Sequence, residues 1–432
     1  MRRGVKLRVG GLIACVVCVA APVSAFAASG GLDRSFGRHG KRITNFGLDD
    51  GAHGVAIQAD GRIVVAGDTQ NPRFSHIAVA RYKPGGRLDR SFSGDGMVRT
   101  DVPGRHDYGE DVAVQANGKI VVVGETGFSD RYETSFDFAT VRYDRDGSRD
   151  HSFAGDGIQT LDFGGSDNSA TPYAVAIQGD GKIVVAGETF GGTSPGNDFA
   201  LVRLNRDGSL DDAFSGDGME RTDLGALEGA KGVGIQDDGK IVAVGGGGAP
   251  AYDLELARYN QDGSLDMSFS GDGIQTTDFG GVDQGEDVAI QDDEKIVAVG
   301  RSGSQFALAR YGMNGELDLT FSGDGKQTTG FAGSAGAEGV AIQRDGKVLA
   351  AGSAQTPAHD RDFALARYDA FGELEPRFSG DGKRTIDLLG KDTGWDLALQ
   401  SNGRIVVTGS SFPSGAGAHD PKGGFATARL LP

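Results

Sequence analysis

Cysteine is nearly absent from this sequence. Cys15 and Cys18 are the only two among 432 residues, and both lie close to the N-terminus. If that segment is cleaved, the chain has no cysteine for a disulfide, a catalytic nucleophile or a thiolate metal site. A chain without disulfides must hold its fold by packing alone.

The sequence also lacks the apolar periodicity of long amphipathic helices. No long stretch repeats its apolar residues at the helical period, and hydrophobic residues are moderate at 38%. Glycine is abundant at 73 residues, which favours many short strands joined by tight turns. A chain of 432 residues is too long for one conventional core, so we expect several packed units.

Positive charge is scarce as well. The formal net charge is −17, and removal of the four Lys and Arg residues at positions 1–8 makes it −21. Nucleic-acid binding requires a basic surface, so we expect no DNA or RNA partner. We expect a monomer.

The first 27 residues have the composition of an export signal. MRRGVKLR is basic, VGGLIACVVCVAAPV is apolar, and Ala25-Phe26-Ala27 offers a cleavage site. No stop-transfer pattern follows, so we predict no membrane span and a mature chain of residues 28–432. That chain would be secreted, periplasmic or attached to the cell surface. Arg2-Arg3 as a twin-arginine signal and Cys15 as a lipoprotein cysteine stay open as variants.

Three short motifs recur seven times in a fixed order. LDRSFSGDG at 88–96 has counterparts beginning at 32, 149, 210, 265, 317 and 374. VAIQADGRIVVAG at 55–67 has counterparts beginning at 112, 175, 233, 288, 340 and 397, and FALARY at 363–368 has counterparts beginning at 77, 138, 199, 254, 306 and 425. Repeats of this size indicate units that cannot bury their apolar faces alone.

Each unit contains four strand-like runs, which we call A, B, C and D. In the first unit they are VAIQ (55–58), RIVVAG (62–67), IAVARY (77–82) and MVRTDV (97–102). Four strands repeated seven times predict an all-β, seven-bladed β-propeller, because a β-helix needs far shorter repeats. The mature chain begins with a lone D run at 41–46 and ends with a C run at 425–430. We therefore expect these two runs to pair and close the ring.

These three motifs resemble the delta-60 repeat family, whose signature is similar to LDxSFSGDG, VAIQxDGKIVVAG and FALARY in that order. The similarity covers nearly all of residues 32–430. It implies a secreted or surface propeller related to the NHL-like group, with VAIQxDGKIVVAG forming the two inner strands. The family has no assigned activity, so the resemblance leaves the function open.

The two faces of such a propeller differ in how much they vary. The A–B turns and C–D segments are nearly uniform, whereas the B–C loops range from RSGSQ (301–305) to SSFPSGAGAHDPKGG (410–424). Variable loops on a rigid scaffold usually carry binding. The leading prediction is therefore a binding module that takes a protein or glycan on its B–C and D–A face.

The residues just before each A run should surround the mouth of the central channel. They differ from unit to unit, are mostly acidic and include the single Trp of the chain. Asp111, Asp287 and Asp396 occupy equivalent places in three units, and converging oxygen ligands could hold Ca²⁺. A solvated acidic entrance without a cofactor is the alternative. The predicted ligand-binding ring consists of His53, Glu110, Asp111, Tyr173, Lys231, Glu286, Asp287, Glu338, Trp395 and Asp396.

Two other functions stay open. One is a Ca²⁺-dependent enzyme of the lyase or lactonase kind with its metal on the channel axis, since some NHL-like propellers resemble such enzymes. The other is an architectural protein of the cell surface. The sequence contains no P-loop, H-E-x-x-H or G-x-S-x-G motif, so an enzyme is the less favoured prediction.

Two polar residues recur in all seven units. We expect the Arg of each C run, such as Arg81, to pair with an acid of the D run, such as Asp101. We expect the Gln that ends each A run, such as Gln58, to bond neighbouring backbone, because a buried amide needs partners. Seven copies argue for structure and against a single active site.

Overall fold

The computed structural model of the chain describes residues 29–47, 49–71, 73–102, 106–129, 134–163, 169–190, 196–225, 229–247, 252–357, 359–413 and 423–432. The predicted signal segment, 1–27, lies outside these residues. The described residues form strands and turns and contain no helix. Accordingly, no helix capable of spanning a membrane occurs in that part of the chain.

The A and B runs form the strands that the motifs predict. The A strands are β2 (Asp49–Ile57), β6 (His106–Val114), β10 (Ala170–Ile177), β14 (Gly229–Ile235), β18 (Asp283–Ile290), β22 (Ala335–Ile342) and β26 (Gly390–Leu399). The B strands are β3 (Ile63–Gln70), β7 (Ile120–Ser129), β11 (Ile183–Phe190), β15 (Ile241–Gly247), β19 (Ile296–Ser302), β23 (Val348–Thr356) and β27 (Ile405–Pro413).

The C and D runs also form strands. The C strands are β4 (Ser75–Tyr82), β8 (Thr134–Tyr143), β12 (Asn197–Leu204), β16 (Asp253–Tyr259), β20 (Gln305–Tyr311), β24 (His359–Tyr368) and β28 (Gly424–Leu430). The D strands are β1 (Lys41–Thr44), β5 (Met97–Thr100), β9 (Ile158–Leu161), β13 (Met219–Thr222), β17 (Ile274–Thr277), β21 (Lys326–Thr329) and β25 (Lys383–Ile386).

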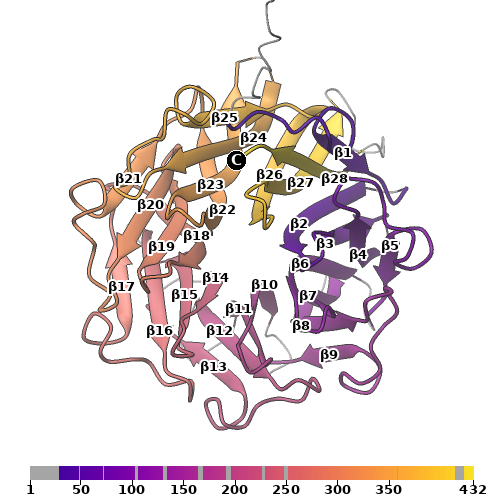
Figure 1. Cartoon of the computed structure of the whole chain (residues 1–432). Coiled ribbons are helices and arrows are strands. Elements are labelled where there is room, and N and C mark those ends of the chain that lie inside the picture. Colours follow the sequence, from indigo (N-terminus) through magenta and orange to yellow (C-terminus); the bar gives the residue numbers. More distant parts are fainter. Residues whose placement is uncertain are drawn as a thin grey trace, which may run out of the picture.

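Consecutive A, B, C and D strands pair antiparallel into four-stranded sets. Sets such as β10-β11-β12-β13 form separate sheets, whereas a single parallel bridge, Ser75 with His106, links the sets of β2–β5 and β6–β9. Figure 1 shows the sets around a central opening, with the A strands beside it and the D strands outermost. The side chains of the A strands therefore have access to the centre of the molecule.

The first and last described strands lie side by side. β1 pairs antiparallel with β28 in register from Lys41 with Ala428 to Thr44 with Phe425. These are the two strands that the sequence expects to pair. Residues before β1 also contact β28, because Leu32 bridges Leu430 as Leu88 bridges Tyr82 within the first set. The N-terminal segment thus takes the place that a D strand takes in the other sets.

The core lies between neighbouring sheets. The B strands are buried on both faces, as their continuous apolar runs predict, and β28 is buried throughout. One cluster combines Val64 of β3 with Val122 of β7 and Val141 of β8, so each set buries its face against the next. This is the packing expected of repeats that are unstable alone.

The LDRSFSGDG motif forms the joint between a C and a D strand. Phe92 is fully buried and packs against β7 and β8 of the following set. Gly94 and Gly96 turn the chain at φ values of 86° and 97°, a region that glycine adopts without steric cost. The Ser93 N–H donates to the carbonyl oxygen of Asp146 in the next set at 2.6 Å. The motif is therefore a structural joint between neighbouring sets of strands.

The predicted partner of the recurring Arg is wrong. Arg81 Nη2 lies 2.9 Å from Asp89 Oδ2 in the joint, and its guanidinium lies 4.7 Å from the centre of the Phe92 ring. The bridge between Tyr82 and Leu88 brings Asp89 opposite Arg81, so the acid follows from the turn and not from the D run. The same pair recurs in Arg142–Asp150, Arg203–Asp211, Arg258–Asp266, Arg310–Asp318 and Arg429–Asp33.

The expected role of the recurring Gln is confirmed in several sets. Gln58 Nε2 donates to the carbonyl oxygen of Gly118 in the next set at 3.2 Å. Gln400 Nε2 donates in the same way to Gly61 at 3.2 Å, which joins the last set to the first.

Part of the predicted long B–C loops is strand. β7 and β8 pair as far as Ser129 with Thr134, so most of 125–137 is an extended hairpin. The same occurs in β23 and β24, which pair as far as Thr356 with His359. Residues 130–133, 191–195, 248–251 and 414–422 of these connections lie outside the described residues.

Candidate functional site

Each A strand contains a β-bulge at the position that we predicted to face the channel. In β2, for example, the register with β3 shifts between Ala52 and Gly54, which leaves His53 without a partner in the ladder. A bulge redirects the side chain of its extra residue, and bulges are frequent beside functional sites. The seven bulge residues are His53, Glu110, Tyr173, Lys231, Glu286, Glu338 and Trp395.

These side chains meet in one cavity at the centre of the molecule. Its volume is about 490 Å³, which is in the range of small-molecule sites. Gln284, Arg301 and Arg361 complete its polar lining. All ten predicted ring residues line this cavity, namely His53, Glu110, Asp111, Tyr173, Lys231, Glu286, Asp287, Glu338, Trp395 and Asp396.

Asp111, Asp287 and Asp396 connect neighbouring A strands. Asp111 Oδ2 accepts a hydrogen bond from the Val175 N–H of the next set at 2.9 Å, and its Oδ1 accepts one from the Val112 N–H at 2.6 Å. The equivalent bonds to the next set run from Val340 N–H to Asp287 at 2.8 Å and from Val55 N–H to Asp396 at 2.7 Å. These carboxylates therefore stabilise the inner ring of strands.

The same three aspartates were the predicted calcium ligands. Among the described residues, the groups of three acidic or histidine residues whose ligand atoms lie within 4.8 Å of one another do not include this trio. Burial raises the pKa of Asp287 to about 7, so the three buried carboxylates sit where negative charge is unfavourable. Calcium binding by the trio stays a prediction, and it would compete with the backbone hydrogen bonds.

Glycine precedes each of these aspartates around the ring. A Cβ on Gly54 would lie 2.8 Å from the Asp111 Cα, and one on Gly232 would lie 2.7 Å from the Asp287 Cα. Both distances are too short for a real contact with backbone. A side chain at Gly54 or Gly232 would therefore collide with the backbone of the next unit, so glycine at these two positions lets the inner strands approach each other closely.

His53 is the centre of a charged cluster on one side of the cavity. Its Nδ1 lies 3.0 Å from Glu110 Oε2 and its Nε2 lies 3.3 Å from Asp68 Oδ1. Burial alone would lower the pKa of His53, but the two carboxylates raise it to about 10. Trp395 stacks on the imidazole with ring centres 5.5 Å apart and an angle of 6°. A protonated His53 thus holds the Trp ring in place at the mouth.

A second cluster lies beside the first. Tyr173 donates its hydroxyl hydrogen to Glu188 Oε1 at 2.8 Å, and Lys231 Nζ lies 3.2 Å from the centre of the Tyr173 ring. Lys231 Nζ is also 3.8 Å from Glu188 Oε2. Burial lowers the pKa of Lys231, although Glu188 and other acids oppose the shift. The cluster presents an ammonium group and a fixed phenol ring to the cavity.

Glu286 and Glu338 are two further acidic residues of the lining. Burial and, to a smaller extent, the charge of Glu338 raise the pKa of Glu286 to about 8, while Lys231 and Arg301 oppose the shift. Burial likewise raises the pKa of Glu338. Glu286 is therefore mostly protonated at neutral pH and can donate a hydrogen bond or a proton to a bound molecule.

The sequence prediction missed the outer layer of this site. Asp68, Glu125, Glu188 and Arg301 directly follow the glycine that recurs in each B strand, at a position that varies among units. They lie beside the bulge residues because Tyr108 pairs with Glu125 and Gln284 pairs with Arg301 across the A–B ladder. The break in the B motif after this glycine is a signal that could have found them.

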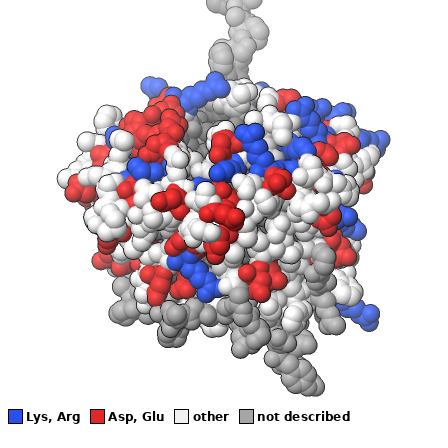
Figure 2. All heavy atoms as spheres, turned by 90° about the horizontal axis from the view of Figure 1, so that it is seen from below, with Lys and Arg blue, Asp and Glu red and all other residues white. Residues whose placement is uncertain are grey.

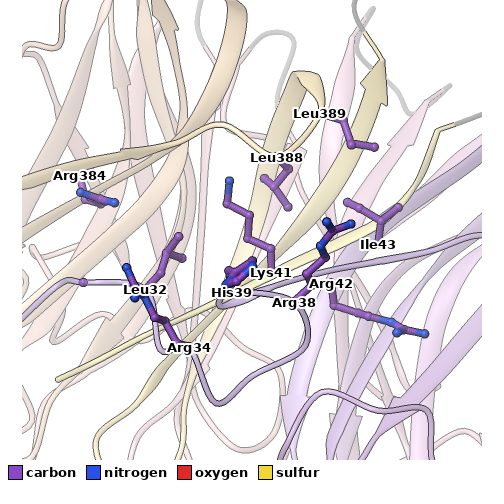
Figure 3. Close-up of a pocket in the computed structure, with 11 residues that line it drawn as sticks. Leu32, Arg34, Arg38, His39, Lys41, Arg42, Ile43, Arg384, Leu388 and Leu389 are labelled. Carbon is purple, nitrogen blue, oxygen red and sulfur yellow. The ribbon is translucent and has the colours of Figure 1, made fainter. Parts of the chain in front are cut away.

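A second cavity was also missed. It has a volume of about 1170 Å³ and lies between the N-terminal segment with β1 and the segment around β25. Figure 3 shows Arg38, His39 and Lys41 side by side in it, with Leu388 and Leu389 nearby. Among the residues that the structure describes, this lining contains no acidic side chain, so its chemistry suits an anion. Its residues come from opposite ends of the chain, which sequence spacing alone does not bring together. The basic lining is Arg34, Arg38, His39, Lys41, Arg42 and Arg384.

The charges elsewhere are mixed. Figure 2 shows Asp and Glu spread over one side of the molecule with Lys and Arg between them. This distribution agrees with the net charge of −17 and gives no electrostatic basis for nucleic-acid binding on the side shown.

The fold and its repeated four-stranded sets define a β-propeller repeat protein. Six segments match the model of a family described as "Domain of unknown function (DUF5122) beta-propeller", at residues 58–92, 115–153, 178–214, 236–269, 291–321 and 343–378. Each segment runs from the Gln that follows an A strand to the buried Phe of the joint. No curated protein matches the chain.

A solved structure with a TM-score above 0.5 shows the same fold at low sequence identity. Virginiamycin B lyase from Staphylococcus aureus is similar over 91% of this chain and 99% of its own, with 10% identity and a TM-score of 0.51. Sqt1 from Chaetomium thermophilum is similar over 90% of this chain and 100% of its own, with 11% identity and a TM-score of 0.48. These likenesses concern the fold alone.

Proposed function

We propose that the chain is an exported binding module that takes a glycan or protein at the mouth of its central channel. One observation carries this proposal: seven bulge residues of five different types line one cavity of about 490 Å³. Uniform positions elsewhere serve packing, so a ring whose residue type varies among equivalent positions requires another explanation. Recognition of one ligand provides it.

The scaffold in this proposal is a seven-bladed propeller of delta-60 type, closed by β1. Three features support closure: the pairing of β1 with β28, the hydrogen bond from Gln400 to Gly61 and the Arg429–Asp33 pair. The six family matches agree, because a seventh unit would begin at Gln400 and finish at Phe36. Such a unit is split between the chain ends and gives no continuous match.

The lining favours a sugar over a flat protein surface. Trp395 is 36% exposed and offers an aromatic face, while carboxylates and Arg301 surround it with hydrogen-bonding groups. Aromatic faces pack against the C–H faces of sugar rings, and the acids accept hydrogen bonds from hydroxyl groups. The cavity volume fits a terminal sugar or a short oligosaccharide.

A glycan-binding screen of residues 28–432 tests the proposal. The tryptophan fluorescence of the chain reports directly on the site, since Trp395 is the single Trp. We expect a bound glycan to change this fluorescence, and Glu338→Gln to weaken binding about tenfold. Phe371→Ala is the control, because Phe371 is 67% exposed and lies outside the cavity lining. No binding by any glycan, or equal binding by Glu338→Gln, contradicts the proposal.

An enzyme is the second candidate, and the raised pKa of Glu286 favours it. A carboxyl group with a pKa of about 8 in a cavity can act as a general acid at neutral pH. In this version the chain is a lyase or lactonase, and its metal-dependent form would place Ca²⁺ at Asp111, Asp287 and Asp396. Turnover of a bound glycan or lactone that is lost in Glu286→Gln would favour the enzyme. Binding without turnover would favour the binding module.

A further inference from the structure

Three carboxylates meet at the junction between β14–β17 and β18–β21. Asp253 begins β16, Asp278 follows β17 and Asp283 begins β18, and one oxygen of each lies within 4.8 Å of the others. The pairing of Leu254 with Thr277 brings Asp253 opposite Asp278. The Asp283 N–H donates to the carbonyl oxygen of Tyr252 at 2.6 Å and so brings β18 to this pair.

The buried member of this cluster has an unsatisfied oxygen. Asp283 is only 1% exposed, and its Oδ2 accepts a hydrogen bond from the Phe279 N–H at 2.6 Å. Its Oδ1 and the Oδ1 of Asp253 are buried without a hydrogen-bond partner. A buried carboxylate oxygen without a partner is costly. A positively charged or hydrogen-donating group would therefore be favourable at this place.

Equivalent junctions show what usually fills it. Asp50 Oδ1 accepts a hydrogen bond from the Thr69 hydroxyl at 2.5 Å, and Asp107 Oδ1 accepts one from the Thr126 hydroxyl at 2.6 Å. Ser302 lies opposite Asp283 in the strand register but does not satisfy its Oδ1.

The residue opposite the D-run acid also differs between junctions. At the junction of β4, β5 and β6, His76 stands where Asp253 stands, and its Nδ1 lies 3.6 Å from Asp101 Oδ1. A histidine there can supply a positive charge, whereas Asp253 adds a negative one. At the junction of Asp283, by contrast, the Ser302 hydroxyl leaves Oδ1 without a partner, and an aspartate takes the place of His76.

We propose that Asp253, Asp278 and Asp283 bind a Ca²⁺ ion that joins the two neighbouring sets of strands. Oxygens within 4.8 Å of one another can share an ion at about 2.4 Å from each, the distance typical of calcium. Calcium prefers carboxylate oxygens and completes its coordination with water. The ion neutralises three negative charges and satisfies the buried Oδ1 atoms.

Isothermal titration of the EDTA-treated chain from residue 28 with CaCl₂ tests this site. We expect binding by the unmodified chain, and a rise in its melting temperature with Ca²⁺. Asp278→Asn and Asp253→Asn should each weaken the binding about tenfold or more, because each removes one charged ligand. Asp278 is exposed and Asp253 is partly exposed, so Asn should be tolerated by the fold at both positions.

The matched control is Asp101→Asn, which makes the same change in the equally close group of His76, Asp101 and Asp107. That group contains a histidine, and both oxygens of its buried Asp107 already accept hydrogen bonds, from Thr126 and from the Val102 N–H. The calcium affinity of this variant should stay within about twofold of the unmodified chain. Failure of the unmodified chain to bind Ca²⁺ at millimolar concentration would overturn the inference. Binding that is lost in Glu338→Gln but kept in Asp278→Asn would place the ion at the channel mouth and would also overturn it. Neither result depends on the glycan screen.

Discussion

The C–D joint and the channel mouth each recur at a fixed place in every unit, but the joint repeats its residues whereas the mouth varies them. The joint repeats one set of contacts: a buried Phe, an Arg over its ring and an Asp beside the Arg, as in Arg203, Phe214 and Asp211. The mouth uses the same backbone device, a bulge, but the bulge residue varies among His, Glu, Tyr, Lys and Trp. Repetition therefore marks packing in this chain, and its loss marks the candidate binding site.

The two regions should also differ in what a substitution does. Joint residues are buried and shared between neighbouring sets, so their loss should lower stability wherever it occurs. The bulge side chains lie outside the ladder and contact the cavity, so their loss should affect local charge more than global stability. The following experiments test this division.

The largest expected effect is that of Phe214→Ala in the joint. Phe214 is fully buried and packs between two sets, so its removal should lower the free energy of unfolding by about 3–5 kcal/mol. Urea denaturation followed by circular dichroism measures the loss. Phe371→Ala is the control, because Phe371 is 67% exposed and should change stability by less than about 0.5 kcal/mol. Similar losses in both variants would contradict the assigned role of the joint.

A smaller loss is expected from Gly232→Ala in the inner ring. The new Cβ would lie 2.7 Å from the Asp287 Cα and 2.9 Å from Val244 Cγ1, so the strands must separate. The expected loss is about 1–3 kcal/mol in the same urea assay. Gly179→Ala is the matched control, since a Cβ there meets no atom within 4 Å. Equal stability of the two variants would show that the inner strands are not tightly apposed.

Much of this division could be predicted from the sequence. The repeated runs locate the strands, and the unpaired D run at 41–46 predicts the pairing of β1 with β28. The ten ring residues were found because equivalent positions of repeated units must face the same axis. The sequence position relative to the A motif of its own unit was enough to assign both Trp395 and Glu286 to this ring.

The rest depended on pairing between strands. The bulges arise from the register of A against B, which no single run contains. Arg81 pairs with Asp89 because a turn folds the chain back on itself, and charge alone suggested Asp101 instead. The backbone hydrogen bonds of Asp287 reach the neighbouring set at Val340, so its structural role required the arrangement of both sets.

The side chains at the channel mouth should affect stability mainly through their ionisation, and less through packing. The pKa of Glu286 is raised to about 8 in the folded chain. Its contribution to stability is therefore complete below the unfolded pKa of about 4.5 and is lost as the pH rises through 8. Glu286→Gln cannot ionise, so its stability relative to the unmodified chain should rise between about pH 5 and pH 9, by at most about 4 kcal/mol for a pKa raised from about 4.5 to about 8. Urea midpoints across this range measure the difference.

The exposed Glu373 provides the control for this pH effect. Glu373→Gln should change stability by the same small amount at both ends of the pH range. If the stability of Glu286→Gln changed with pH in parallel with that of the unmodified chain, the cavity would not hold the Glu286 carboxyl group in its protonated form.

The smallest effect is spectroscopic and concerns His53 and Trp395. Glu110 and Asp68 raise the pKa of His53 to about 10 against the opposing effect of burial, so the imidazole stacked on Trp395 should stay charged through neutral pH. Loss of this charge near pH 10 should change the emission of Trp395, the single Trp of the chain. His53→Gln should abolish the transition, whereas His39→Gln, at an exposed position outside the central cavity, should keep it. A transition near pH 6.5 instead, the value of an unperturbed histidine, would mean that Glu110 and Asp68 do not hold His53 in its charged form. It would also mean that the channel mouth is more open to water than the comparison of the mouth with the C–D joint implies.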